Sequence, residues 1–332
     1  MNPKIRNGWI ALASALMLAH AAAQTVPAPV SFPTRAVTLV VPFPAGGPSD
    51  ALARAVAQPM GARLGQPVVI ENVGGAGGTI GLAKVAKSPA DGHTLGFGTI
   101  GTHVANVALY KKLPYNPLGD FQPVGVAGLA PMILVARPNL PAGNLTEFVA
   151  WLRNNPGKVS YGSAGVGSIS HFACVMLLSA LKLDVTHVPY RGVAPAMNDL
   201  MGGQIDFMCD QTTTALGQVA GGKIKALAVL SNARLPQLPQ LATAQASGYP
   251  DVNVRSWNAL FAPKGTPAAV MQRLTEALAA ALADPALRQQ LAAVGVDLPS
   301  ADHGGPSAVT ALIEQGLKHE VPALKARVEY LD

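Results

Sequence analysis

The chain has 332 residues, of which 49% are hydrophobic and 13% charged, and its formal net charge is +6 at pH 7. A chain of this length is too long for a single hydrophobic core and fits two domains of roughly 100–150 residues each. The hydrophobic content excludes a disordered chain. The basic residues are scattered and not interleaved with aromatic residues, which argues against a nucleic-acid-binding protein.

The N-terminus has the pattern of a cleavable secretory signal peptide over residues 1–23. Lys4 and Arg6 precede an apolar run at residues 9–19, and the small residues 21–23 follow. The run is shorter than the roughly 20 residues that span a membrane. The pattern therefore predicts an exported protein. Without the peptide, 22 basic and 18 acidic residues remain, and this net +4 weakly favours anionic ligands.

The chain that follows alternates between short β-branched runs and Ala- or Leu-rich helical stretches, which predicts an α/β fold with a parallel sheet covered on both faces. The predicted strands lie at residues 37–42, 68–70, 94–97, 132–136, 159–161, 185–188, 205–208 and 224–230. The predicted helices lie at residues 51–64, 79–86, 145–153, 171–181, 195–201, 267–283, 285–293 and 307–318. Residues 231–265 are rich in Pro and Gly and are predicted to be irregular.

Two α/β units are expected, the second inserted into the first. We define the first lobe as residues 34–123 and 231–332, and the second lobe as residues 124–230. The two crossings would form a hinge, and a cleft between lobes is a natural site for a small ligand.

Three strand-to-helix turns carry the residues that can bind an anion, because backbone N–H groups at a helix N-terminus are unpaired and aligned with the helix dipole. In the first turn, residues 43–50, Gly46 and Gly47 let a ligand approach the backbone. Pro48 has no N–H to offer. Asp50 is interpreted as a helix cap or a support for the loop.

The second turn, residues 163–171, places several serine hydroxyls before a helix, with Ser168 as a candidate N-cap. In the third turn, Arg191 is either a bidentate partner for a carboxylate or an exposed surface residue. Asp210 follows a predicted strand and is favoured as a helix cap, with a ligand contact as the alternative.

The two cysteines, Cys174 and Cys209, are the only ones in the chain. Two buried thiols are the favoured interpretation, since Cys packs as a small hydrophobe. A disulfide stays open, because an exported protein meets oxidising conditions and sequence cannot show the distance between the two residues.

Motifs for catalysis or cofactors are weak. The chain has no H-E-x-x-H and no C-x-x-C, so no metal site is predicted. Ser163 lacks the glycine of a nucleophile elbow, and His171 is interpreted as structural. Residues 96–101 match G-x-G-x-x-G, with Asp120 about 20 residues on, but they follow the third strand instead of the first. No cofactor is predicted.

Ordered stretches through the mature chain resemble the substrate-binding proteins of tripartite tricarboxylate transporters, the TctC or Bug family. The matching stretches are residues 35–47, 69–72, 74–78, 90–95, 120–124, 161–165, 187–192, 199–206, 257 and 262–267. Each is unspecific alone, but together and in order they are specific. Pro48 departs from the family pattern, which has a small donor residue there.

The resemblance implies a two-lobed periplasmic binding protein fold of type II that closes on a small carboxylate. It implies no enzymatic activity, a monomer, and small and large membrane subunits as partners. The residues it implies for the ligand site are Phe43, Ala45, Gly46, Gly47, Asp50, Ser163, Gly167, Ser168 and His171, with Thr99, Arg191, Gly192 and Asp210 as further cleft members.

Two other functions stay open at this point. A periplasmic sensor of the same fold would bind its ligand in the same way and differ only in its membrane partner. A secreted hydrolase would need a nucleophile and a base within hydrogen-bond reach, and the sequence does not bring such a pair together. The ligand class also stays open among di- and tricarboxylates, aromatic acids and acidic amino acids.

Overall fold

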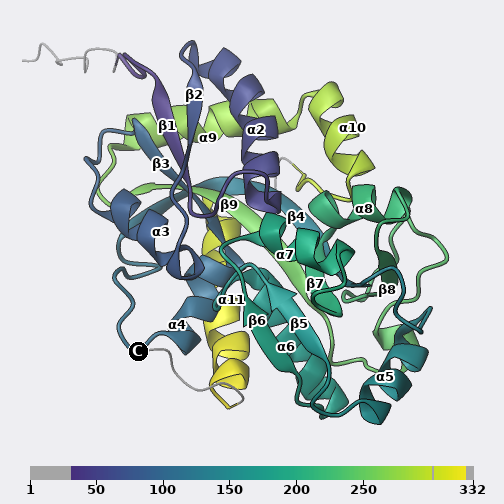
Figure 1. The fold of residues 1–332 in the computed structure, drawn as a ribbon. Helices are drawn as coiled ribbons and strands as arrows, with labels where there is room; N and C mark the ends of the chain where they lie inside the picture. Colours follow the sequence, from purple (N-terminus) through teal and green to yellow (C-terminus); the bar gives the residue numbers. More distant parts are fainter. Residues whose placement is uncertain (1–30, 301–302, 327–332) are drawn as a thin grey trace, which may run out of the picture. The chain divides into compact units, whose positions relative to one another are not determined.

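The structure is a computed structural model that describes residues 31–300 and 303–326. The predicted signal peptide lies outside these residues. The described residues from Pro33 onward form one compact unit. Strands and helices alternate along it, so the predicted α/β class is confirmed (Figure 1).

The described strands join in one nine-stranded sheet, in the order β2-β1-β3-β9-β4-β7-β5-β6, with β8 also paired to β4. The strands are β1 (Val37–Val41), β2 (Val68–Asn72), β3 (Thr94–Thr99), β4 (Phe121–Ala136), β5 (Ser160–Ser163), β6 (Thr186–Pro189), β7 (Phe207–Gln211), β8 (Lys225–Val229) and β9 (Arg255–Pro263).

Helices precede, follow or connect these strands. They are α2 (Pro48–Leu64), η1 (Ala76–Gly78), α3 (Thr79–Ala86), the π-helix η2 (Gly101–Ala105), α4 (Asn106–Leu109), α5 (Leu145–Asn154), α6 (Ile169–Leu181), α7 (Val193–Met201), α8 (Thr212–Ala220), η3 (Gln245–Ser247), α9 (Ala268–Leu282), α10 (Pro285–Ala293) and α11 (Pro306–Lys325).

The sheet is mixed, which corrects the expectation of a parallel sheet. Strand β1 pairs in parallel with β2 and β3, and β5 pairs in parallel with β6 and β7. Between these groups the pairings of β9 and β4 are antiparallel. Strand β9 lies in the segment 231–265 that was predicted to be irregular, so that prediction was wrong.

Strand β4 joins the two parallel groups. Its first part, residues 121–131, pairs with β9, and its last part, residues 132–136, pairs with β7 and β8. Only residues 132–136 were predicted as a strand. The glycines and prolines of residues 121–131 hid the remainder, because both residue types are depleted in strand interiors.

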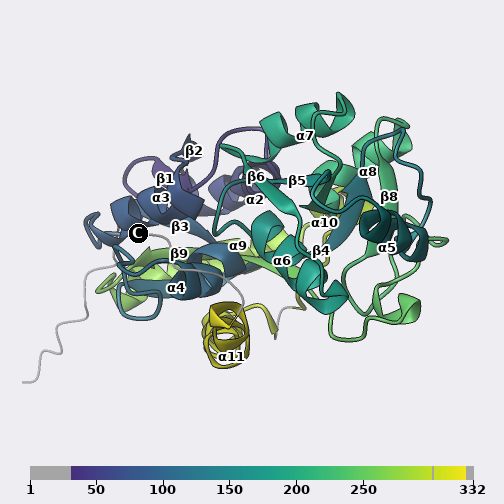
Figure 2. The ribbon, with the colours of Figure 1, turned by 60° about the horizontal axis from the view of Figure 1, so that its bottom comes forward.

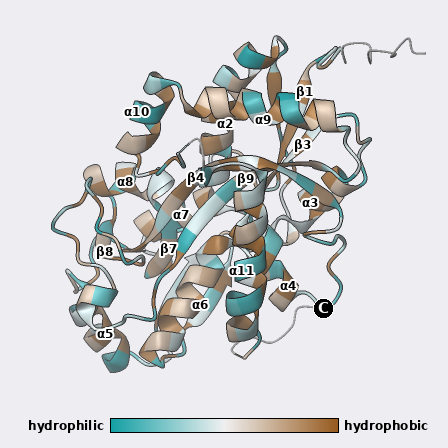
Figure 3. Cartoon of the chain, turned by 180° about the vertical axis from the view of Figure 1, so that it is seen from behind, coloured by the Kyte–Doolittle hydropathy of each residue, from teal (hydrophilic) through white to brown (hydrophobic). Residues whose placement is uncertain are grey.

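Both faces of the sheet are covered, as the predicted apolar runs require. Along β4, Met132 and Leu134 pack into one core, whereas Ile133 and Val135 pack into another. Successive strand residues point to opposite faces, so this alternation shows helices burying each side. Helix α11 packs against β4 and α4 (Figure 2). Its hydrophilic and hydrophobic segments alternate, as expected of a helix with one buried side (Figure 3).

Cys174 of α6 and Cys209 of β7 form a disulfide, with their Cα atoms 5.4 Å apart. This corrects the favoured interpretation of two free thiols. Both residues are fully buried, as predicted. Packing α6 on β7 brings the two residues together across 35 positions, which the sequence cannot show.

The glycines of the G-x-G-x-x-G match make room for side chains. A Cβ on Gly98 would lie 2.4 Å from ring atoms of both His103 and Phe261. These rings stack with their centres 4.0 Å apart. Gly98 therefore serves the core in this fold. Among the described residues, no helix is both long and apolar enough to cross a membrane.

Candidate functional site

Four helices begin around one cavity. Strands β1, β5, β6 and β7 each lead into a helix, and the N-cap residues of α2, α6, α7 and α8 are Gly47, Ser168, Gly192 and Gln211. All four N-caps line the same cavity. The residues that line it are Phe43, Pro44, Gly47, Pro48, Ser49, Ala164, Ser168, Ile169, Ser170, Gly192, Val193, Asp210 and Gln211.

The cavity is small, about 20 Å³, which is room for about one water molecule. Larger hollows exist, including one of about 120 Å³ between α9 and Gly305 and one of about 570 Å³ beside α2 and β2. Neither gathers several helix N-termini. We therefore place the candidate site at the small cavity, where the backbone chemistry converges.

The first turn is held in shape by Asp50. Its carboxylate accepts hydrogen bonds from the Gly46 N–H at 2.9 Å and from the Asn72 side chain at 3.0 Å, and it forms an ion pair with Arg54. Burial alone would raise the pKa of Asp50, but Arg54 and these hydrogen bonds lower it below its ordinary value. Of the two interpretations offered, support of the loop is confirmed, since Gly47 is the N-cap.

The other residues of the first turn differ in position. Phe43 and Gly47 line the cavity, whereas Ala45 and Gly46 are exposed and do not. The Gly46 N–H is occupied by Asp50. Pro48 is the first residue of α2, so the helix begins with a residue that has no N–H to lose.

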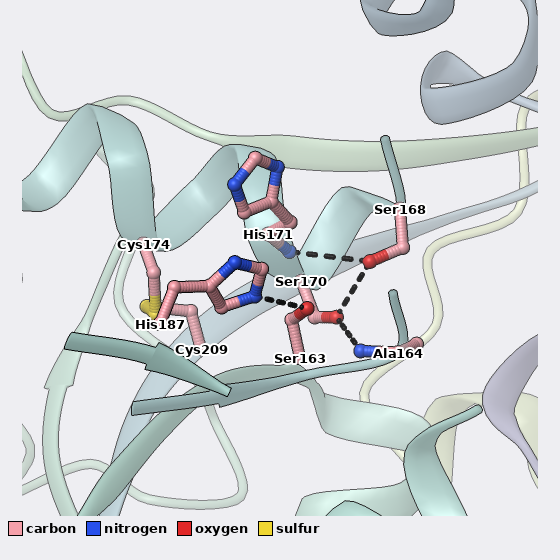
Figure 4. The surroundings of a disulfide bond; sticks show 8 residues. All are labelled: Ser163, Ala164, Ser168, Ser170, His171, Cys174, His187 and Cys209. Atoms are coloured by element: carbon pink, nitrogen blue, oxygen red, sulfur yellow. Dashed lines mark hydrogen bonds between the residues drawn. A yellow bond between two sulfur atoms is a disulfide. The ribbon is translucent and has the colours of Figure 1, made fainter. Parts of the chain in front are cut away.

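In the second turn, serine hydroxyls form hydrogen bonds with the backbone groups of the loop (Figure 4). The Ser168 hydroxyl donates to the Gly165 carbonyl at 2.6 Å and accepts from the His171 N–H at 3.3 Å, which confirms the predicted N-cap. The Ser170 hydroxyl accepts from the Ala164 N–H at 2.8 Å. The donors that remain in the first turn of α6 are therefore the N–H groups of its first residues, which line the cavity.

Ser163, Gly167 and Thr99 do not line the cavity, although each was predicted in the site. Thr99 is fully buried, and its N–H donates to the Thr102 hydroxyl at 2.9 Å. Gly167 has φ +85°, and a Cβ there would lie 2.2 Å from the Asn106 side-chain oxygen. Both residues therefore shape loops around the site and do not face it.

Ser163 and His187 form the hydroxyl–imidazole pair that the sequence did not reveal. The Ser163 Oγ lies 2.7 Å from His187 Nε2, and it also accepts the Gly165 N–H at 3.1 Å. Ser163 is fully buried, and neither Ser163 nor His187 lines the cavity. The pair acts as a fixed hydrogen bond beneath the second turn.

His171 lies beside this pair. Its ring stacks on His187 with centres 4.5 Å apart. Burial, and then the charge of His187, lower the pKa of His171 to about 3, and burial lowers the pKa of His187 to about 4. Both rings are therefore neutral near pH 7, and the structural interpretation of His171 fits this position.

Arg191 is exposed and lies outside the residues that line the cavity. In this structure Arg191 is thus an exposed surface residue, the second of the two alternatives that the sequence left open. Its neighbour Gly192 does line the cavity, with φ +111°, and a Cβ there would lie 3.1 Å from the Pro44 ring. Glycine at this position lets the first and third turns touch.

Asp210 is 1% exposed and lines the cavity at the end of β7. It is not the cap of α8, because Gln211 holds that position, so the favoured prediction was wrong. One carboxylate oxygen, Oδ2, accepts the Thr214 hydroxyl at 2.6 Å. Burial raises the pKa of Asp210 to about 6, although Thr214 and Gln211 partly oppose this.

Sequence reasoning missed several residues that line the cavity. They are Pro44, Pro48, Ser49, Ala164, Ile169, Ser170, Val193 and Gln211. Most occupy the first turn of a helix or its cap, so a rule that includes the first residues of each helix would have found them. Among the described residues, no cluster of His, Cys, Asp or Glu is arranged to hold a metal ion.

A mixed α/β fold whose helix N-termini converge on one cavity defines a solute-binding protein of the periplasmic type. The family model for the TctC family, the tripartite tricarboxylate transporter family receptor, matches residues 52–327. The chain belongs to this family, as its sequence resemblance indicated.

Individual relatives agree with this assignment. A UPF0065 protein of Agrobacterium vitis is 42% identical over 294 residues, which cover 89% of this chain and 84% of the relative. The structure of the periplasmic binding protein BugD superposes with a TM-score of 0.87 at 40% identity and covers 90% of this chain and 100% of BugD. MatC of Rhodopseudomonas palustris, solved with bound malate, gives a TM-score of 0.85 at 39% identity, with 90% and 100% coverage.

Proposed function

We propose that this chain is a periplasmic solute-binding protein that captures a small carboxylate and delivers it to a tripartite tricarboxylate transporter. The observation that carries the proposal is the convergence of four helix N-termini on one cavity. Each N-terminus adds unpaired N–H donors and the positive end of a helix dipole. An anion is the ligand that such a site stabilises.

Backbone donors supply the recognition in this proposal. Among the described residues that line the cavity, none is Lys, Arg or His. The ligand carboxylate is therefore held by N–H groups of the first helical turns, including those of Ser49, Ile169 and Val193. The R. palustris relative was solved with malate, a dicarboxylate, which supports the same ligand class here.

Ligand entry requires the walls of the cavity to separate. A space of about 20 Å³ is too small for a dicarboxylate. Residues 43–49 form one wall and residues 164–211 form the other, and these belong to the proposed first and second lobes. We assign the opening to a hinge where β4 changes partners, between Pro131 and Met132, which places residues 124–131 with the first lobe instead of the second.

The remaining features of the proposal follow from the family. The protein is exported by its signal peptide, acts as a monomer without catalysis, and meets one small and one large membrane subunit. The buried position of Ser163 supports a binding protein over a hydrolase.

The experiment is a thermal-shift and calorimetry screen of the mature chain against mono-, di- and tricarboxylates, aromatic acids, acidic amino acids and neutral solutes. A ligand that binds the folded state at 100 times its Kd stabilises it by about 2.7 kcal/mol. We expect a shift confined to one class of carboxylates. Shifts with neutral solutes alone would overturn the proposal.

A variant then locates the site. Gly47→Val adds a side chain in the cavity at a backbone position, φ −86°, that valine tolerates, and the nearest atom to its Cβ is the Pro44 carbonyl oxygen at 3.7 Å. Gly305→Val is the matched control, since Gly305 is also an N-cap followed by Pro. We expect binding to fall at least tenfold in the first variant only. Equal affinities in both variants would move the site elsewhere.

A further inference from the structure

One carboxylate oxygen in the cavity has no partner. Asp210 Oδ1 is buried and accepts no hydrogen bond from any described residue, whereas Oδ2 is bonded to the Thr214 hydroxyl. A buried polar atom left unpaired is costly, and a charged one more so. The second oxygen therefore needs a donor that the fold does not supply.

The fold also holds Asp210 firmly in place. Its neighbour Cys209 is bonded to Cys174, and Asp210 itself pairs with Ile133 in the β4–β7 register. Met208 packs in the core beneath α7, and Asp210, two positions on, faces the same side of the sheet. This side carries Gly192 and Val193, which also line the cavity.

We propose that Asp210 is the specificity-determining residue of the cavity, and that it selects carboxylates bearing a hydrogen-bond donor, a hydroxyl or an ammonium group, on the carbon next to the bound carboxylate. This inference rests on the proposed function and names its ligand class. Asp210 lines the same cavity as the four N-caps, so we place the α-carbon of a carboxylate held at the helix N-termini beside Asp210. A donor there bonds to Oδ1.

The unsubstituted acid lacks this bond, so its bound carboxylate lies near the Asp210 carboxylate with no hydrogen-bond donor between them. Like charges at short range repel each other. No lysine, arginine or histidine lines the cavity to offset that repulsion. A site built to accept a hydrogen bond rejects an analogue without the donor, because its own polar atom then stays unpaired.

The test compares acids that differ only in this substituent, by calorimetry on the mature chain. The sets are succinate, malate and aspartate; tricarballylate and citrate; phenylacetate and mandelate. In the set that binds, we expect the substituted acid to bind at least about tenfold tighter than the unsubstituted one, the scale of one hydrogen bond to a charged group. Malate against aspartate distinguishes hydroxyl from ammonium.

Asp210→Asn replaces the accepting oxygen with an amide that can donate to a carboxylate. In this variant we expect the preference to fall to within about threefold or to reverse. Asp251→Asn, at an exposed position away from the cavity, is the control and should keep the wild-type preference.

The outcomes separate the two proposals. If carboxylates bind but the wild-type chain shows no preference within any set, the role of Asp210 is overturned while the proposed function stands. A wild-type preference that Asp210→Asn leaves intact also overturns it. If no carboxylate binds, the proposed function is overturned, and the role of Asp210 falls with it. Should Asp210→Asn not fold, the wild-type comparison still decides.

Discussion

Asp50 lies in the first turn of α2, Asp210 lies directly before the N-cap of α8, and both carboxylates are buried. The fold uses them differently. The Asp50 carboxylate is paired with the Gly46 N–H, the Asn72 side chain and Arg54, and these bonds hold the first turn in place. Asp210 keeps one oxygen free of partners among the described residues. The residue with unused bonding capacity is the one that can discriminate among ligands.

Buried histidines make the fold sensitive to acid. Burial lowers the pKa of His103 to about 3, and burial followed by the charge of His187 lowers that of His171 to about 3. Above pH 6.5 both folded and unfolded chains hold these rings neutral. Below pH 6.5 these histidines become protonated in the unfolded chain but stay neutral in the folded chain. The free energy of unfolding therefore falls as the pH falls.

We expect His103 and His171 together to lower the free energy of unfolding by up to roughly 4 kcal/mol between pH 6.5 and 5, about 1.4 kcal/mol per pH unit for each. His187, whose pKa burial lowers to about 4, adds to this loss. Asp210 opposes this, because its pKa is raised to about 6 and the folded chain gains a proton there before the unfolded chain does. Urea unfolding at several pH values measures the effect. Asp210→Asn should steepen the loss, and a flat profile would contradict this account.

At the scale of elements, the disulfide joins a helix that begins at the cavity to a strand that ends there. Cys174 lies in α6, whose N-terminus carries Ser168 and Ile169, and Cys209 directly precedes Asp210 (Figure 4). The bond therefore fixes the second turn against the end of β7.

Replacing both cysteines with alanine should lower the free energy of unfolding by about 3–4 kcal/mol, the chain-entropy value for a loop of 35 residues. Chemical denaturation with and without a reducing agent measures this loss. The double variant should show no further response to the reductant, which serves as the control. Unchanged stability after reduction of the wild-type chain would refute the expected contribution.

At the scale of the whole molecule, the proposed function requires the two lobes to move. Both native cysteines are bonded to each other, so introduced cysteines can be labelled selectively. We expect the distance between fluorescent labels at Ala62→Cys and Lys158→Cys, one in each lobe, to change when a carboxylate binds. Labels at Ala62→Cys and Lys264→Cys, both in the first lobe, should keep their distance.

Single-molecule energy transfer with and without the bound carboxylate measures these distances. A neutral solute that does not bind should change neither pair. If ligand binding leaves the Ala62–Lys158 pair unchanged, then the cavity admits its ligand without movement of the lobes.

Much of the fold was predictable because local patterns carry it. The β-branched runs of β1 and β2 and the Pro48 start of α2 are local signals, and the structure confirms them. Strand β9 was missed, because Asn258 and flanking prolines interrupt its apolar pattern and its stability comes from pairing with β3 and β4.

The sequence by itself determined the family, the α/β alternation and the turns where an anion can bind, since each depends on residues close together in the chain. Only the tertiary structure decided which turn residues face the cavity, that Arg191 is exposed, and that Cys174 and Cys209 are bonded. These facts depend on distances between segments far apart in the chain. Packing sets such distances, and no local pattern encodes them.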